Sequence, residues 1–215
     1  MIRTCRVVYS SLAKTGGQEK YIKALKDTRK PIVVAIGPAG TGKTFLACQE
    51  GINSIAYRHV DNLVITRPTK SVDEDHGYLP GDINKKLAPW LQPIFDSIKK
   101  SDYSGKSKIK NSIEISPLAY MRGRTFDHSW IIADEMQNAT ANQMKMMLTR
   151  IGDGSKLVVT GDLQQIDVRD SGLLDFLNRL EKYPNPEHIE FVELSSDDII
   201  RHEAVKEVLN VYSDK

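Results

Sequence analysis

A glycine-rich run near the start of the chain has the spacing of a phosphate-binding loop. The run consists of Gly37, Pro38, Ala39, Gly40, Thr41, Gly42, Lys43 and Thr44, followed by Phe45. It fits the pattern Gly-x4-Gly-Lys-Ser/Thr and separates an apolar stretch from a helix-like one. Glycines let backbone N–H groups converge on phosphate oxygens, Lys43 is expected to reach the β- and γ-phosphates, and the Thr44 hydroxyl is expected to ligate Mg2+. The run predicts a nucleoside triphosphate site; the alternative is a glycine-rich turn without a ligand.

Two acidic residues follow a second apolar stretch, over 130–133. A carboxylate at the end of a strand facing the phosphate loop can hold Mg2+ through water, the role expected of Asp134. The adjacent Glu135 can polarise water for attack on the γ-phosphate, which favours hydrolysis over transfer to another substrate. The alternative is a strand that ends in solvent-facing acids.

A third apolar stretch, over 157–160, also turns polar at its end. There the sequence reads Gly161-Asp162-Leu163-Gln164-Gln165. A neutral amide at this point can contact both the γ-phosphate and the attacking water, so Gln165 is the candidate sensor. Asp162 is expected to orient it or to join the metal shell. A simple turn at Gly161 and Asp162 is the alternative.

These residues require a framework of alternating strands and helices. Short apolar runs predict strands over 32–36, 63–66, 113–115, 130–133, 157–160 and 189–194. Helix-like stretches cover 18–26, 43–56, 82–100, 141–151, 171–180 and 201–211, and Thr140 with Gln143 indicates a capping box. Continuous rather than alternating hydrophobicity indicates strands buried on both faces. The pattern predicts a doubly wound α/β fold with a mainly parallel sheet and helices on both faces.

Length and composition limit the remaining possibilities. A chain of 215 residues favours a single domain over 1–215, with a proline-containing insertion at 67–110. No run of the sequence is long and apolar enough for a membrane span, and two cysteines without metal-ligand spacing favour a reducing, cytoplasmic location. The net charge of +2 conceals an asymmetry: residues 1–180 carry 26 basic and 19 acidic residues, hence +7. A basic body is typical of proteins that bind nucleic acid.

Several segments together resemble the PhoH-like, phosphate-starvation-inducible ATPases. The similar segments are 37–47, 66–68, 77–82, 117–125, 134–138, 143–146 and 160–162, and the likeness extends from about residue 17 to 211. Related superfamily-one helicases share the strand-end Asp-Glu pair and the Gly-Asp-x-x-Gln segment. Met136, Glu203 and a short segment over 168–172 depart from the family pattern, which puts a nucleic-acid role of that last segment in question.

The resemblance implies a RecA-like core that hydrolyses ATP with Mg2+, a role on RNA with helicase activity in some members, and ring assemblies, as hexamers. It also implies that Gln18 reads the adenine edge and that Arg201, in a late Asp-x-x-Arg-His segment, completes an active site. A surface role is the alternative for Gln18. Superfamily-one helicases place ATP between two lobes, so a neighbouring subunit is expected to supply the second one, with Arg201 or another basic residue acting in trans.

Four further residues are candidates for contacts with a single strand. Arg67 directly follows a predicted strand, Arg122 and Arg124 flank Gly123 before the next one, and Tyr120 is close enough in sequence to stack on a base. The alternative is that these arginines form ion pairs with nearby acids.

Three functions fit the residues. The preferred one is an ATPase that acts on RNA or another single-stranded nucleic acid. A nucleotide-dependent protein-assembly switch would keep every nucleotide-site residue. A small-molecule P-loop kinase would need an acceptor pocket, and Glu135 and Gln165 argue against it.

Overall fold

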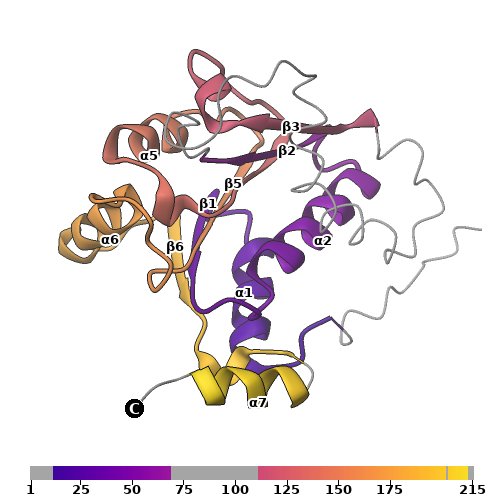
Figure 1. Cartoon of the computed structure of the whole chain (residues 1–215). Coiled ribbons are helices and arrows are strands. Elements are labelled where there is room, and N and C mark those ends of the chain that lie inside the picture. Colours follow the sequence, from indigo (N-terminus) through magenta and orange to yellow (C-terminus); the bar gives the residue numbers. More distant parts are fainter. Residues whose placement is uncertain (1–11, 69–110, 202, 213–215) are drawn as a thin grey trace, which may run out of the picture.

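The chain builds one six-stranded parallel sheet. The computed structural model describes residues 12–68, 111–201 and 203–212, and in it the strands lie in the order β3-β2-β4-β5-β1-β6 (Figure 1). Every pairing between neighbouring strands is parallel. The strands are β1 (Ile32–Ile36), β2 (Asn62–Arg67), β3 (Ile113–Pro117), β4 (Ser129–Ala133), β5 (Lys156–Gly161) and β6 (Ile189–Glu193). The predicted doubly wound α/β fold is confirmed.

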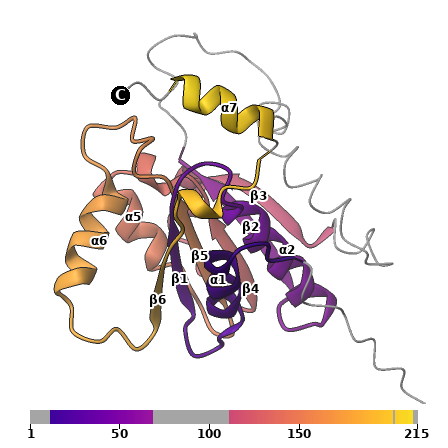
Figure 2. The ribbon, with the colours of Figure 1, turned by 90° about the horizontal axis from the view of Figure 1, so that it is seen from below.

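Helices cover both faces of this sheet (Figure 2). α1 (Gly16–Lys26) and α2 (Lys43–Ala56) lie on one face, and α5 (Ala141–Leu148) and α6 (Gly172–Lys182) lie on the other. Successive strand residues alternate between the two layers: Val33 packs in the core under α1 and α2, whereas Val34 packs in the core under α5 and α6. Since both faces are covered, both sets of side chains must be apolar, which explains the continuous hydrophobic runs.

Polar side chains define where several helices begin. The Thr15 hydroxyl accepts a hydrogen bond from the Gln18 N–H at the start of α1, and Ser171 caps α6. The capping box predicted at Thr140 and Gln143 is present at the start of α5. Such caps satisfy N–H groups that have no partner within the helix.

Short 3-10 helices and one further helix complete the described chain. They are η2 (Leu118–Met121), η3 (Met136–Asn138), η4 (Ser196–Asp198) and α7 (Glu203–Tyr212). The predicted helix over 82–100, and all but the first two residues of the predicted insertion over 67–110, lie outside the described residues. The single-domain boundaries therefore stay a prediction. In the part of the chain that the structure describes, no helix is both long and apolar enough to cross a membrane.

The parallel arrangement gathers the polar strand ends on one side. We call the edge formed by the carboxyl ends of all six strands the carboxyl edge, and the opposite one the amino edge. Arg67, Asp134 and Asp162 end or follow β2, β4 and β5, while the glycine-rich loop follows β1. All of them therefore meet at the carboxyl edge, where ligands bind in open α/β sheets.

Candidate nucleotide site

The loop between β1 and α2 is curved by its glycines and closed by its lysine. Gly40 has a φ of +90° and Gly42 a φ of +86°, conformations that L side chains rarely adopt. The Lys43 ammonium donates hydrogen bonds to the carbonyl oxygens of Gly37 at 2.6 Å and Pro38 at 2.9 Å. The loop thus surrounds a cation and precedes the N-terminus of a 14-residue helix, an arrangement that suits a phosphate.

The charge of Lys43 is shaped by its surroundings. Burial lowers the pKa of this ammonium, while Asp162, Glu135 and Asp134 partly oppose the shift through their negative charges. Three carboxylates near one lysine show that the strand ends face the loop.

Gln18 of α1 is buried and contacts the phosphate loop. Its side chain is 3% exposed, its amide nitrogen donates to the Thr41 carbonyl oxygen at 3.0 Å, and its amide oxygen accepts from the Lys14 N–H at 2.9 Å. The alternative of a surface glutamine is therefore wrong. An amide has two N–H donors and two oxygen lone pairs, so these two contacts leave capacity for a base edge. The adenine contact stays a prediction.

Asp134 joins the loop to the neighbouring strands. Its Oδ1 atom accepts hydrogen bonds from the Thr44 hydroxyl at 2.7 Å and from the Thr160 hydroxyl at 2.5 Å. A hydroxyl and a carboxylate oxygen side by side are the hard oxygen donors that Mg2+ prefers, and Mg2+ in such sites takes one or two carboxylates together with phosphates of the substrate. These residues fit a magnesium–nucleotide complex. The contact of Thr160 with Asp134 could not be predicted, because a threonine at a strand end gives no signal of its own.

Glu135 is held in an unusual conformation between two partners. Its backbone has a φ of 55° and a ψ of 36°, in the left-handed region that a glutamate seldom occupies. Oε1 lies 2.9 Å from Nη2 of Arg67, and Oε2 accepts a hydrogen bond from the amide of Gln137 at 2.5 Å. Backbone strain of this kind is concentrated at functional sites.

Gln137 is a site residue that sequence reasoning missed. Its side chain is fully buried, and besides contacting Glu135 its amide oxygen accepts from the Asp162 N–H at 3.1 Å. It therefore links the ends of β4 and β5. In the sequence, Gln137 is recognisable only by its position two residues after Glu135, within a segment that resembles the PhoH-like family.

The turn after β5 carries the predicted sensor. The Asp162 carboxylate accepts from the Gln164 N–H at 2.9 Å, and the Asp162 carbonyl accepts from the Gln165 N–H at 3.1 Å. Asp162 thus shapes the turn, and the Gln165 residue is exposed on it. The sensor role stays a prediction.

Arg201 lies over the phosphate loop of its own chain. A Cβ built on Gly40 would lie 2.5 Å from Nε of Arg201, and the Ile200 N–H donates to the Gly40 carbonyl oxygen at 3.1 Å. Arg201 thus lies beside the loop of its own chain, and its action in trans stays a prediction.

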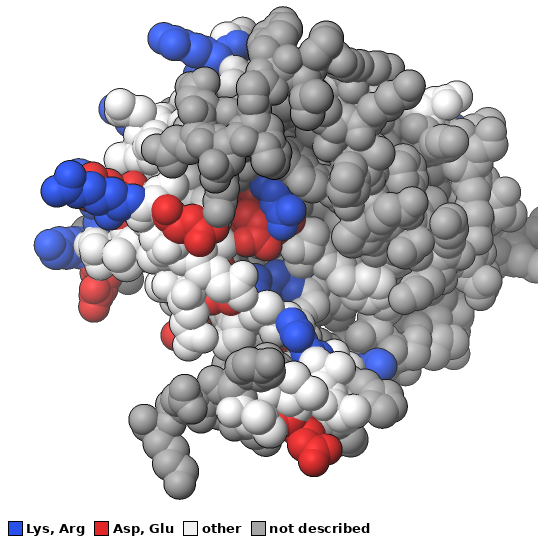
Figure 3. Space-filling view, viewed as in Figure 1, with Lys and Arg blue, Asp and Glu red and all other residues white. Residues whose placement is uncertain are grey.

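The four nucleic-acid candidates divide into two sets. Arg67 pairs with Glu135 and Asp134, and Arg124 pairs with both carboxylate oxygens of Glu114. The ion-pair alternative thus describes both of these arginines. Tyr120, at 56% exposure, and Arg122 are exposed on or beside η2. On the face shown in Figure 3, basic and acidic side chains adjoin near the centre.

The sheet, the loop and the strand-end carboxylates define a P-loop nucleotide-binding protein. A family model described as PhoH-like protein matches residues 12–213. The chain belongs to the PhoH-like family, whose members are P-loop NTPases.

Individual relatives extend over most of this chain. It is 40% identical over 202 residues to a PhoH-like protein of Bacillus subtilis, covering 93% of this chain and 63% of that protein. It is 36% identical over 219 residues to Protein PhoH of Escherichia coli K12, covering 99% of this chain and 61% of that protein. The chain thus spans about three fifths of the length of these curated relatives. Among solved structures, the Pif1 helicase of Candida albicans has a TM-score of 0.46 and 17% identity, over 91% of this chain and 42% of that one.

Proposed function

We propose that this chain hydrolyses ATP with Mg2+ and couples hydrolysis to binding or remodelling of RNA or another single-stranded nucleic acid. The observation that carries the proposal is the pair of adjacent carboxylates at the end of β4. Asp134 contacts the Thr44 hydroxyl of the loop, whereas Glu135 beside it contacts Arg67 and Gln137. Asp134 can then bind the metal, and Glu135 can activate the attacking water.

Each residue has a distinct part in the proposed reaction. The loop N–H groups and Lys43 bind the phosphates, and Thr44 with Asp134 holds Mg2+, which would neutralise charge on the transferred phosphoryl group. Glu135 takes the proton from the attacking water, and Gln165 orients that water. Arg201, beside Gly40, is proposed to stabilise charge on the γ-phosphate from within the same chain.

Residues at the carboxyl ends of β2 and β3 support the nucleic-acid part of the proposal. β2 and β3 are paired so that Arg67 lies opposite Pro117, and η2 with Tyr120 follows directly. Arg67, Tyr120 and Arg122 thus gather on the side of β4 away from the loop. A cation that binds phosphate and an aromatic ring that stacks on a base are the usual contacts to a single strand.

The test is ATP turnover with and without single-stranded RNA or DNA, over a salt series. We expect stimulation of several-fold that is lost at high salt, because contacts to a phosphate backbone release counterions. Turnover that neither polymer changes would instead favour the nucleotide-dependent assembly switch.

The ring assembly is part of the same proposal, and the position of Arg201 makes it testable. If Arg201 acts in cis, mixing Arg201→Ala with wild-type chains lowers activity in proportion to the variant fraction. A loss of activity larger than the fraction of variant chains would show that Arg201 acts on a neighbouring subunit. Sedimentation of the wild-type protein with and without nucleotide decides whether a hexamer forms.

A further inference from the structure

The segment after β6, residues 194–201, contacts the phosphate loop at two points. The Leu194 N–H donates a hydrogen bond to the carbonyl oxygen of Ile36 at 2.8 Å, at the end of β1 where the loop begins. The Ile200 N–H donates to the Gly40 carbonyl oxygen at 3.1 Å, in the middle of the loop. The end of the segment is thereby placed beside the loop, and its place depends on how the residues between the two contacts are held.

Asp198 joins this segment to the start of α1. The residue is buried, and its Oδ1 atom accepts hydrogen bonds from the Thr15 hydroxyl at 2.5 Å and from the Gly17 N–H at 3.1 Å. Its Oδ2 atom accepts from the Ser195 N–H at 2.9 Å, within the segment itself. η4, which contains Asp198, packs against α1 (Figure 2). One side chain thus joins two parts of the chain that are 183 residues apart in sequence.

The start of α1 is itself joined to the loop through Gln18. The Thr15 hydroxyl, which donates to Asp198, also accepts from the Gln18 N–H at 3.2 Å. The Gln18 side chain in turn donates to the Thr41 carbonyl oxygen of the loop at 3.0 Å. The loop is therefore contacted by Gln18 of α1 and by Ile200 of the segment after β6, and Asp198 joins these two neighbours of the loop to each other.

The contacts of Asp198 require a carboxylate. Each of its two oxygens accepts a main-chain N–H, from Gly17 and from Ser195. An asparagine has only one side-chain oxygen, so its amide N–H groups would face one of these donors. Burial raises the pKa of the Asp198 carboxyl, but the hydrogen bonds from Thr15, Ser195 and Gly17 outweigh burial and hold the pKa below its ordinary value. Asp198 is therefore ionised at neutral pH.

The glycine at position 17 is required by the close approach of this carboxylate. A Cβ built on Gly17 would overlap the carboxylate of Asp198, whereas a Cβ built on the preceding Gly16 would meet no atom within 4 Å. A methyl group at position 17 would therefore displace the carboxylate, and a methyl group at position 16 would leave it in place.

Arg201 ends the segment that Asp198 holds. Among the residues that the structure describes, its guanidinium has neither a hydrogen-bond partner nor an ion-pair partner. Its position beside Gly40 therefore depends on the main chain that carries it. A group that stabilises developing charge is effective when it is held in place before the reaction.

We propose that Asp198 is a positioning residue: it fixes the segment after β6 to α1 and thereby holds Arg201 at the phosphate loop, where Arg201 stabilises charge on the γ-phosphate. Asp198 acts through Arg201 and makes no contact with the nucleotide in this account. The inference rests on the proposed function, because it requires that Arg201 serve the γ-phosphate.

The experiment is a double-mutant cycle of Asp198→Asn and Arg201→Ala, measured as ATP turnover. Arg201→Ala should lower turnover by about a hundredfold, the loss typical of a charge-stabilising donor. Asp198→Asn should lower turnover several-fold in the wild-type background, and by less than about twofold when Arg201 is already replaced. Asp197→Asn is the matched control, because it removes the same charge from the exposed neighbouring residue. It should behave as wild type.

A second pair of variants displaces the carboxylate without removing its charge. Gly17→Ala should reproduce the loss of turnover seen with Asp198→Asn, whereas Gly16→Ala should keep wild-type turnover. Turnover is compared at a temperature below the thermal unfolding transition of every variant, so that loss of folded protein does not contribute.

Two results would overturn the positioning role. If Asp198 only stabilised the start of α1, Asp198→Asn would lower turnover by the same factor with and without Arg201. Wild-type turnover of Asp198→Asn or of Gly17→Ala would likewise show that Arg201 does not depend on this carboxylate.

Nucleotide binding distinguishes failure of the positioning role from failure of the proposed function. Arg201 at the γ-phosphate should raise the affinity for a non-hydrolysable ATP analogue relative to ADP. Arg201→Ala and Asp198→Asn should each lower this ratio, with no further loss in the double variant. If Glu135→Gln is as active as wild type, the proposed hydrolysis fails, and the affinity cycle still decides the role of Asp198. If Arg201→Ala changes neither turnover nor the affinity ratio, the positioning role fails.

Discussion

The acids at one edge of the sheet and a lysine at the other are held in different ways. At the carboxyl edge Asp134 and Glu135 contact other side chains: Thr44 to Asp134, Arg67 to Glu135, and Gln137 to Glu135. At the amino edge the contacts of Lys156 run to the main chain. The Lys156 ammonium donates to the carbonyl oxygens of Ala24 and Asp27, each at 2.9 Å, at the end of α1.

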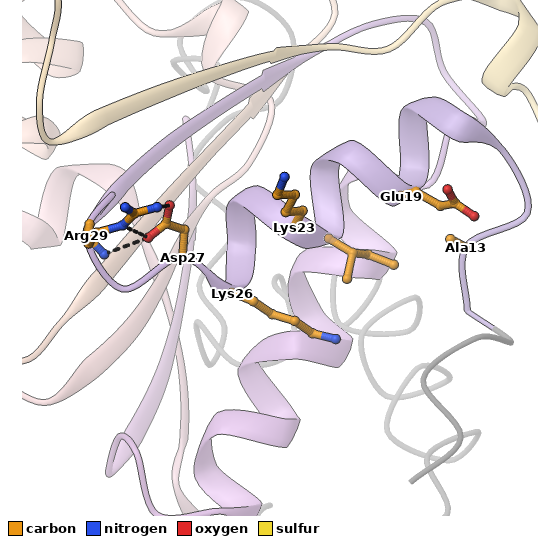
Figure 4. Close-up of a pocket in the computed structure, with 7 residues that line it drawn as sticks. Ala13, Glu19, Lys23, Lys26, Asp27 and Arg29 are labelled. Atoms are coloured by element: carbon orange, nitrogen blue, oxygen red, sulfur yellow. Dashed lines mark hydrogen bonds and ion pairs between the residues drawn. The ribbon is translucent and has the colours of Figure 1, made fainter.

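The amino edge also has a hollow, but its polar groups serve the fold. A cavity of about 850 Å3 lies between α1, α2 and the turn before β5, and Lys156 lines it together with Glu50. Burial raises the pKa of the Glu50 carboxyl, and Lys26 lies 3.7 Å from it. A shallower hollow lies beside α1, where Arg29 folds back onto Asp27 while Lys23 and Lys26 extend from the helix (Figure 4).

The comparison shows how the same kinds of residue serve different purposes. Lys156 adds a second donor to carbonyl oxygens at the end of α1 that also accept main-chain N–H groups. A carboxylate bonded to hydroxyls, an amide and an arginine can exchange those partners for a ligand. We therefore expect substitutions at the carboxyl edge to change activity with little effect on stability, and substitutions at the amino edge to do the reverse.

The largest effect is expected for Asp134→Asn. Asparagine keeps an oxygen for the Thr44 and Thr160 hydroxyls but loses the charge for Mg2+, so ATP turnover should fall by at least about a hundredfold. Thermal unfolding should shift little. The measurement is a Mg2+ titration of turnover, with Asp175→Asn on α6 as the control. A variant with wild-type turnover at the same Mg2+ concentration would remove Asp134 from the metal site.

A smaller effect, of the opposite kind, is expected for Lys156→Met. The change removes the ammonium donor from the Ala24 and Asp27 carbonyl oxygens, which keep their main-chain N–H donors, and should lower the free energy of unfolding at pH 7 by about 1 kcal/mol. ATP binding and turnover of the folded variant should stay at wild-type levels. Urea denaturation measures the free energy of unfolding, and nucleotide titration measures ATP binding. Lys20→Met, at an exposed position, is the control. Lost nucleotide binding at unchanged stability would contradict the division between the two edges.

A further prediction concerns the pH dependence of stability. Burial lowers the pKa of Lys156 from 10.5 to about 8. Between these values the unfolded chain holds a proton that the native one has released, so the Lys156 contribution to the free energy of unfolding rises with pH across this window. The difference between wild type and Lys156→Met should therefore grow from pH 8 to pH 10. A difference that is constant or that shrinks would show that burial does not govern this lysine.

The fold and the loop could be predicted from sequence because their signals are local. Apolar runs marked all six strands, continuous in β1, β2, β4 and β5 and interrupted by glutamate in β3 and β6, and Thr140 with Gln143 marked the start of α5. The glycine spacing marked the loop. Helix ends shifted by a few residues, as at α5, which ends at Leu148.

The contacts within the site could not be predicted because they depend on strand order. Arg67 and Glu135 are 68 residues apart in sequence and meet only because β2 and β4 are neighbours. The position of Arg201 over Gly40 depends on how the chain turns after β6. Gln137 was overlooked since its role requires the ends of β4 and β5 to lie side by side.

The most direct test of the account is Glu135→Gln, assayed for both ATP binding and ATP hydrolysis. Glutamine keeps the shape and the hydrogen-bonding oxygen but cannot take the proton from water. The account predicts wild-type affinity for ATP with turnover reduced by at least about a hundredfold. Turnover close to wild type would show that another group is the base and would contradict the central claim.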